Sequence, residues 1–261
     1  MRILEYKTVW GFSFAKRVIA VFLVFMMMNF QIAYAAITAG DGGFNTNTDI
    51  KNENGMTNIT GGYINGDTGF HHFNEFGIDP GQIVNQIFGN ANRFVNLVDQ
   101  RVIINGIFNA IKNGQINGDV VFVSPMGIFV GESGIMNVGS LQTIAPSQSA
   151  YQSLINEGAA GSLIWNSDRF NNLELNTSKD YAGTEIAGKI FARNGVSITD
   201  GKQVTIDSRQ EADIVSGFND NGFAKTSGLA FADGGVINLS GIEFDRKDII
   251  NEKGIVDAQY M

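Results

Sequence analysis

Short apolar runs separated by turn pairs dominate the pattern of the chain after residue 35. Each Asn-Gly or Asp-Gly pair tolerates positive φ and therefore predicts a tight turn. The Asn-Gly pairs are 54–55, 65–66, 105–106, 113–114, 117–118, 194–195 and 221–222. The β-branched and aromatic runs between the turns predict strands at 102–104, 120–123, 128–130, 135–138, 186–191, 196–198, 204–206 and 236–239.

The spacing of these strands favours one kind of all-β fold. Three predicted strands lie between residues 118 and 141, and three more lie between 185 and 207. Each triplet takes about 20 residues, which is close to one coil of a β-solenoid. We therefore expect a solenoid whose first coil is capped by the Phe-rich N-terminal third, since an open strand edge invites aggregation. A sandwich or jelly roll is the alternative.

Two segments differ from the strand pattern. Ser147 follows Pro146 and can cap a helix in which Tyr151, Leu154 and Ile155 share one face, before Gly158 ends it. We expect one short helix there, packed outside the coils. The segment 82–98 holds large apolar residues that fit one helical face poorly, among them Ile83, Ile87, Phe88, Phe94, Leu97 and Val98, so its structure is left open between helix and strand.

The N-terminus has the pattern of an export signal. Four basic residues and one acidic residue accompany an uninterrupted apolar run of eleven residues, from Val18 to Met28. A bilayer span needs about 20 residues, whereas the apolar core of a secretory signal needs about 7–15. Small residues at Ala33 and Ala35 predict cleavage between Ala35 and Ala36. Residues 1–35 are then a signal peptide and 36–261 a secreted domain; a buried helix or a retained membrane anchor are the alternatives.

The net charge restricts the possible partners, and the cysteine content restricts how the domain is stabilised. Without residues 1–35 the chain has 14 basic and 25 acidic side chains, a net charge of −11 over 226 residues. Such a surface repels phosphate backbones, so we expect no nucleic-acid partner. The chain contains no cysteine, so the exported domain is expected to depend on its own core rather than on disulfides.

Residues for catalysis are scarce. The two histidines, His71 and His72, are adjacent and would point to opposite faces of a strand, with a polar turn as the simpler interpretation. No nucleophile-elbow or phosphate-loop spacing is present. Asp200-Gly201 and Asp233-Gly234 lie outside any calcium-binding nonapeptide repeat and are interpreted as turns. We expect no catalytic residue, metal or cofactor.

A longer cluster of motifs carries a family resemblance. Its central piece is Ser124-Pro125-Met126-Gly127-Ile128, and its supporting residues are Asn109, Gly114, Gly131, Asn137 and Gly139. Between about residues 69 and 146 the order of these pieces resembles the N-terminal secretion domain of two-partner-secretion exoproteins. These are the filamentous-haemagglutinin-like adhesins, and the leukotoxin-type branch is the most similar. The family motif is NPNGI; here Ser124 and Met126 replace its asparagines, and the family's NPNL motif has no identified counterpart.

The resemblance implies a fold and a role. The implied fold is a right-handed parallel β-helix with an N-terminal cap and small extra-helical hairpins. The implied role is export: periplasmic domains of an outer-membrane transporter recognise the chain, which then folds at the cell surface or is secreted. The turn 124–128 would either contact the transporter or shape a corner of the β-helix.

Two other functions stay open beside export. One is a host-cell or glycan-binding adhesin module in this domain; the other is a β-helix enzyme that degrades polysaccharides. The family places most host binding downstream of the secretion domain. The chain ends at Met261 in a strand-like pattern, so we expect it to be the N-terminal part of a longer exoprotein.

Overall fold

The computed structural model describes residues 35–261, except 42, 179, 182, 202–203, 207–212, 217–235, 242–248, 251–254 and 261. These residues are mostly β-strand and form one long mixed sheet that is not closed into a barrel. The prediction of an all-β chain with little helix is confirmed at this level.

Three ladders of parallel strands make up most of the sheet. Ladder 1 joins β5 (Thr68–Ile78), β7 (Arg93–Val98), β11 (Asp119–Val123), β13 (Ile135–Ile144), β15 (Lys189–Thr199), β18 (Val236–Gly241) and β20 (Ile255–Tyr260). Ladder 2 joins the end of β5 to β8 (Val102–Ile104), β12 (Ile128–Val130), β14 (Thr184–Ile186) and β16 (Val204–Ile206). Ladder 3 joins β3 (Met56–Gly61), β6 (Ile83–Ile87), β9 (Ile107–Lys112), the starts of β13 and β15, β17 (Asp213–Ser216) and β19 (Ile249–Ile250).

Ladder 2 begins with two equal steps along the chain. Ile78, Ile104 and Val130 pair successively in ladder 2 at steps of 26 residues. This step is somewhat longer than the spacing predicted from the strand triplets. The next partner of Val130 is Ile186, because residues 145–183 form an insertion between β13 and β14.

Side chains from all three ladders meet in one apolar core. Phe76, Phe108 and Phe122 lie at its centre, with ring centroids 5.2–5.9 Å apart in edge-to-face contacts. This is the favourable arrangement for aromatic quadrupoles, and it adds to the burial of large apolar area. The predicted role of the Val, Ile and Phe runs as core residues is confirmed for the strands up to β15.

Antiparallel strands flank the parallel ladders. They are β1 (Ala36–Ala39) on β5, β2 (Thr48–Glu53) on β3, β4 (Tyr63–Asn65) on β5, and β10 (Gln115–Ile116) on β9. The β2–β3 and β9–β10 hairpins turn at Asn54-Gly55 and Asn113-Gly114, where both residues of each pair have positive φ. Both turn predictions are confirmed.

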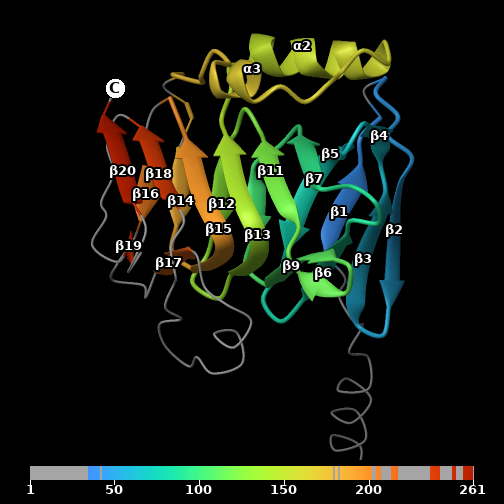
Figure 1. The fold of residues 1–261 in the computed structure, drawn as a ribbon, viewed down its shortest axis with the longest axis horizontal. Coiled ribbons are helices and arrows are strands. Elements are labelled where there is room, and N and C mark those ends of the chain that lie inside the picture. Colours follow the sequence, from blue (N-terminus) through green and yellow to red (C-terminus); the bar gives the residue numbers. More distant parts are fainter. Residues whose placement is uncertain are drawn as a thin grey trace, which may run out of the picture. The chain divides into compact units, whose positions relative to one another are not determined.

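Two helices cover the outer face of ladder 1, whereas one was expected (Figure 1). The expected helix is α2 (Gln148–Ala159), whose N-terminus is capped by the Ser147 side chain accepting from Ala150 N–H. The unexpected one is α3 (Ser167–Asn171), capped by Asn166. Their apolar residues pack on outward-facing side chains of the ladder, so β7 and β11 are buried on both faces.

Three predictions about local structure need correction or completion. The open segment 82–98 forms two strands, β6 and β7, rather than a helix. The predicted strand 186–191 is broken at Ala187-Gly188, where a Cβ on Gly188 would overlap the carbonyl oxygens of Gly131 and Gly134. The predicted turn at Asn194-Gly195 is wrong, because β15 continues through it and pairs with β13 and β18.

Candidate functional site

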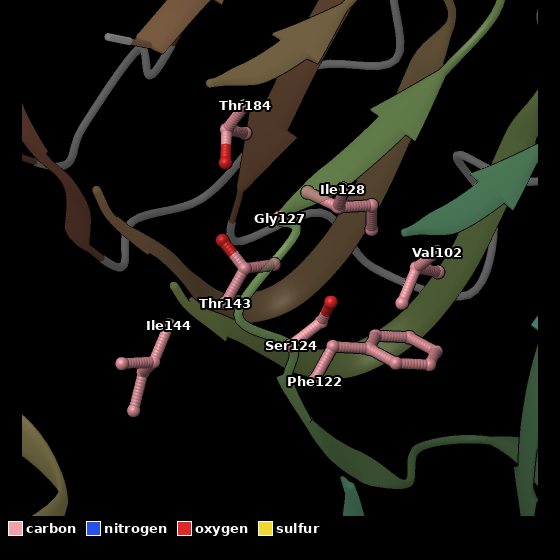
Figure 2. A pocket seen from close by; sticks show the side chains of 8 residues that line it. All are labelled: Val102, Phe122, Ser124, Gly127, Ile128, Thr143, Ile144 and Thr184. Atoms are coloured by element: carbon pink, nitrogen blue, oxygen red, sulfur yellow. The ribbon is translucent and has the colours of Figure 1, made fainter. Parts of the chain in front are cut away.

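The motif Ser124–Ile128 forms the turn between β11 and β12, where the chain passes from ladder 1 to ladder 2. Three of its residues, Ser124, Gly127 and Ile128, line a small hollow (Figure 2). The other lining residues are Val102, Phe122, Thr143, Ile144 and Thr184. The hollow has no space for even a water-sized group, whereas small-molecule pockets typically enclose about 300–1,000 Å³. The site is therefore a packed corner and not a ligand pocket.

A network of hydrogen bonds holds the turn. The Ser124 hydroxyl donates to the carbonyl oxygen of Gln100 at 2.7 Å and accepts from Met126 N–H at 3.1 Å. Gly127 N–H donates to the Ser124 carbonyl at 3.0 Å, and the Gly127 carbonyl accepts from Val102 N–H at 3.0 Å. The Ser124 hydroxyl thus serves as both donor and acceptor within the turn.

The insertion also contacts the turn. The side-chain amide of Asn176 donates to the Pro125 carbonyl at 2.6 Å. Gly127 has a φ of 69°, and a Cβ at this position would overlap the Tyr181 hydroxyl. Both the backbone conformation and the neighbouring side chain therefore require glycine here.

Beneath the turn lies a buried polar group. Asp200 is fully buried and accepts hydrogen bonds from the Tyr181 hydroxyl and, at 2.8 Å, from the Thr184 hydroxyl. Burial, followed by the charge of Asp200, raises the pKa of Tyr181 well above its ordinary value. Tyr181 therefore stays a neutral donor, and Asp200-Gly201 serves as structural support for the corner.

Only one side chain of the motif is available to a partner in the folded chain. Met126 is 42% exposed, whereas Ser124, Pro125, Gly127 and Ile128 are buried. Within the folded domain the motif therefore presents a single flexible apolar side chain, a type that adapts readily to binding surfaces.

Asn109 and Asn137, two of the residues that carry the resemblance, belong to a row of asparagines that was not predicted from the sequence. Asn58, Asn85, Asn109 and Asn137 occupy equivalent positions of β3, β6, β9 and β13. Each side-chain amide donates to the oxygen of the preceding asparagine, at 3.0, 3.0 and 2.8 Å. Their spacing of 24–28 residues was a detectable signal of the repeat. The bonds align adjacent strands of ladder 3.

Steric or conformational reasons explain why glycine occupies the other three positions of the motif cluster, 114, 131 and 139. Gly114 lies in the β9–β10 turn with a φ of 74°. A Cβ on Gly131 would overlap the Asn105 side chain, and one on Gly139 would lie 2.7 Å from the backbone of Asn117. The fold therefore gives a physical reason for glycine at all three positions.

The two histidines are buried on opposite faces of β5, as their adjacency predicts, but they do not form a polar turn. His71 stacks on Phe94 with centroids 4.4 Å apart, and its Nδ1 lies 2.7 Å from the Thr48 hydroxyl. His72 Nε2 lies 3.0 Å from Asp99, which also accepts from the Tyr151 hydroxyl of α2 at 2.8 Å. Each histidine therefore connects β5 to a different neighbouring element.

Several predictions fall outside the described residues: the predicted export signal, of which residues 1–34 are not described, and the predicted turns at 221–222 and Asp233-Gly234. The predicted cleavage point lies at the start of the described residues: Ala35 is partly buried against the core, and Ala36 begins β1. Among the described residues, no group of three or more histidine, aspartate or glutamate side chains is arranged to hold a metal ion. Neither described helix is long and apolar enough to cross a membrane.

Comparison with known proteins adds no relative to this description: no family model, no curated protein and no solved structure matches the chain.

Proposed function

We propose that this chain is the secretion domain of an adhesin-type exoprotein of the two-partner-secretion kind. In this proposal the periplasmic domains of an outer-membrane transporter recognise it, and it reaches the cell surface or medium without performing catalysis. The observation that carries the proposal is the position of the motif Ser124–Ile128. It lies at the turn between ladder 1 and ladder 2, where the chain would pass a corner of the proposed β-helix.

More specifically, we propose that the all-β fold is a right-handed parallel β-helix. Three parallel ladders, the two equal steps of 26 residues at the start of ladder 2 and the single core that the ladders share all support it. The antiparallel strands β1, β2 and β4 then serve as the N-terminal cap, and the β9–β10 hairpin is an extra-helical element. Helices α2 and α3 lie outside the coils.

This fold would suit transport of an unfolded chain. Every coil buries its inward side chains against the preceding coil, so folding outside the membrane proceeds step by step and favours outward movement. The absence of cysteine supports the same route, because no disulfide can close a loop before transit.

Recognition in the periplasm would use extended segments of the chain. We propose that a partly folded segment around Met126 adds to a strand edge of the transporter's periplasmic domain. In the folded domain only Met126 of the motif remains exposed, so its side chain distinguishes recognition from folding.

The test compares two exposed apolar residues. Met126→Lys is expected to reduce the amount of exported protein several-fold without changing the free energy of unfolding, because Met126 is 42% exposed. Ile103→Lys is the matched control: Ile103 is 39% exposed on β8, outside the motif, and its export is expected to stay at the wild-type level. Export is measured by immunoblotting of medium and periplasm in cells that express the transporter.

Equal export of Met126→Lys and the wild type, at equal stability, would contradict recognition through this turn. The motif would then be a structural corner only. An equal loss of export in both variants would indicate a general effect of surface charge.

A further inference from the structure

The strand β2 has one unpaired edge. It pairs with β3 along its whole length, from Thr48↔Gly61 to Glu53↔Met56, and no other described strand pairs with it. In Figure 1 β2 is the outermost strand on its side of the sheet. An open edge with free backbone groups is a ready template for another strand.

The hairpin geometry determines which backbone groups face outward. The two-residue turn Asn54-Gly55 makes Glu53 and Met56 a hydrogen-bonded pair, and such pairs alternate along an antiparallel ladder. Asp49, Lys51 and Glu53 therefore bond to β3. The N–H and C=O groups of Thr48, Ile50 and Asn52 point to the open edge.

The side chains of β2 carry alternating charge on one face. Asp49 and Lys51 form an ion pair of 2.8 Å, and both side chains are largely exposed. On the other face, Ile50 is half-buried and packs against the edge of the core. The edge thus combines three free donor–acceptor residues, an apolar side chain and two opposite charges.

We propose that this edge is an interface between two copies of the chain, which pair antiparallel through β2 with Ile50 opposite Ile50 of the second copy. In that register Thr48 faces Asn52 of the second copy, so the outward backbone groups of Thr48, Ile50 and Asn52 are all paired. Asp49 faces Lys51 of the second copy twice, by the two-fold symmetry of the pair.

The charges of Asp49, Lys51 and Glu53 favour the register centred on Ile50 over the register centred on Lys51. Moving the centre by one residue, to Lys51, would place Lys51 opposite Lys51 and Asp49 opposite Glu53. Like charges directly opposite destabilise a strand pair, whereas opposite charges contribute favourably. The centred register also brings the two Ile50 side chains together on the face that packs toward the core.

The interface is small, so association is expected to be weak. An edge contact of this length lies below the area of stable interfaces, and a dissociation constant of about 10 µM to 1 mM is the expected range. Sedimentation velocity of the full chain over that concentration range measures it. A reversible dimer is expected, and a monomer at every concentration would overturn the proposal.

Charge reversal tests the register. Lys51→Asp places two aspartate pairs across the interface and is expected to weaken association about tenfold. The double variant Asp49→Lys with Lys51→Asp restores both opposite-charge pairs and is expected to recover wild-type association. Circular dichroism and unfolding confirm that each variant is folded. Failure of the double variant to recover association contradicts the register.

Disulfide trapping identifies the facing residues directly, because the chain has no cysteine of its own. Hydrogen-bonded pairs have Cα atoms about 5.5 Å apart, within the range that a disulfide spans. Ile50→Cys is therefore expected to form a covalent dimer on mild oxidation, and Lys51→Cys is expected to form far less. The opposite order would show the other register. Trapping of Ile50→Cys only on a cysteine-bearing strand of a transporter domain would show that the edge serves a different partner.

Discussion

Acidification from pH 6.5 to about pH 4 is expected to lower the free energy of unfolding by about 3 kcal/mol through His71 alone. Burial lowers the pKa of His71 from 6.5 to about 3 in the folded chain. Between these two values the unfolded chain binds a proton that the folded chain does not. The contribution of His71 to the free energy of unfolding is therefore fully present above about pH 6.5 and is lost as the pH falls. Below about pH 3 this contribution changes no further.

The surroundings of His71 explain why its folded form stays neutral. The ring lies between Phe94 and other core side chains, and its Nδ1 has the Thr48 hydroxyl as a partner. Its Nε2 is buried without a hydrogen-bond partner among the described residues. The protonated ring would carry an N–H at Nε2 with no acceptor, and a positive charge with no counter-ion, among the described residues. Both are costly in a core.

Urea unfolding at several pH values between about 4 and 7 measures this effect. In His71→Gln the part of the pH dependence due to this group is expected to disappear, since glutamine does not titrate. Thr48→Val is the matched control: it removes the hydroxyl partner but leaves the buried ring, so the slope with pH should remain. An unchanged slope in His71→Gln would show that other groups cause the acid sensitivity.

Gly127→Ala is expected to destabilise the folded chain by about 2–4 kcal/mol. The φ of 69° is unfavourable for any residue with a Cβ, and that Cβ would also overlap the Tyr181 hydroxyl. Because Tyr181 donates to the buried Asp200, it is not free to move away. The substitution thus disturbs the corner and its polar support together.

Gly114→Ala is the matched control for the conformational part of this cost. Gly114 has a φ of 74°, but nothing lies within 4 Å of the position that its Cβ would take. Its expected destabilisation is about 1 kcal/mol, and denaturant unfolding compares the two variants. Equal costs at Gly127 and Gly114 would contradict the close contact of the corner with Tyr181.

The strands and two hairpins could be predicted because their signals are local. Val102–Ile104, Ile128–Val130 and Val204–Ile206 are strands with the predicted bounds, and Asn54-Gly55 and Asn113-Gly114 are turns. In these places apolar runs and positive-φ residues coincide with the pairing of the fold. Asn194-Gly195 has the same local signal, yet it lies within β15, because pairing to β13 and β18 overrides the turn preference.

The two strands in segment 82–98 were hard to predict for a different reason. β7 is buried on both faces, by the core and by the helices, so its apolar residues lack the alternation of a one-sided strand. A run of this kind resembles a buried helix as closely as a strand. Only the distant α2 and α3 explain its composition.

The candidate site was predicted as a sequence motif but not as a structure. Pro125 and Gly127 indicate a turn by themselves, whereas the contacts with Asn176 and Tyr181 come from about 50 residues further along the chain. The burial of Asp200 and His71 likewise depends on pairing between distant strands. Such contacts have no signal in a single sequence, apart from repeats such as the four asparagines of ladder 3.

The proposed role is tested most directly by the dependence of export on a transporter. The full chain is expressed in a Gram-negative host with its outer-membrane transporter, with a transporter lacking its periplasmic domains, and with no transporter. Export to the surface or medium is expected only with the intact transporter, and the chain should remain in the periplasm in the other two. Equal export in all three, or retention in all three while the transporter exports its own substrate, would contradict the proposed function.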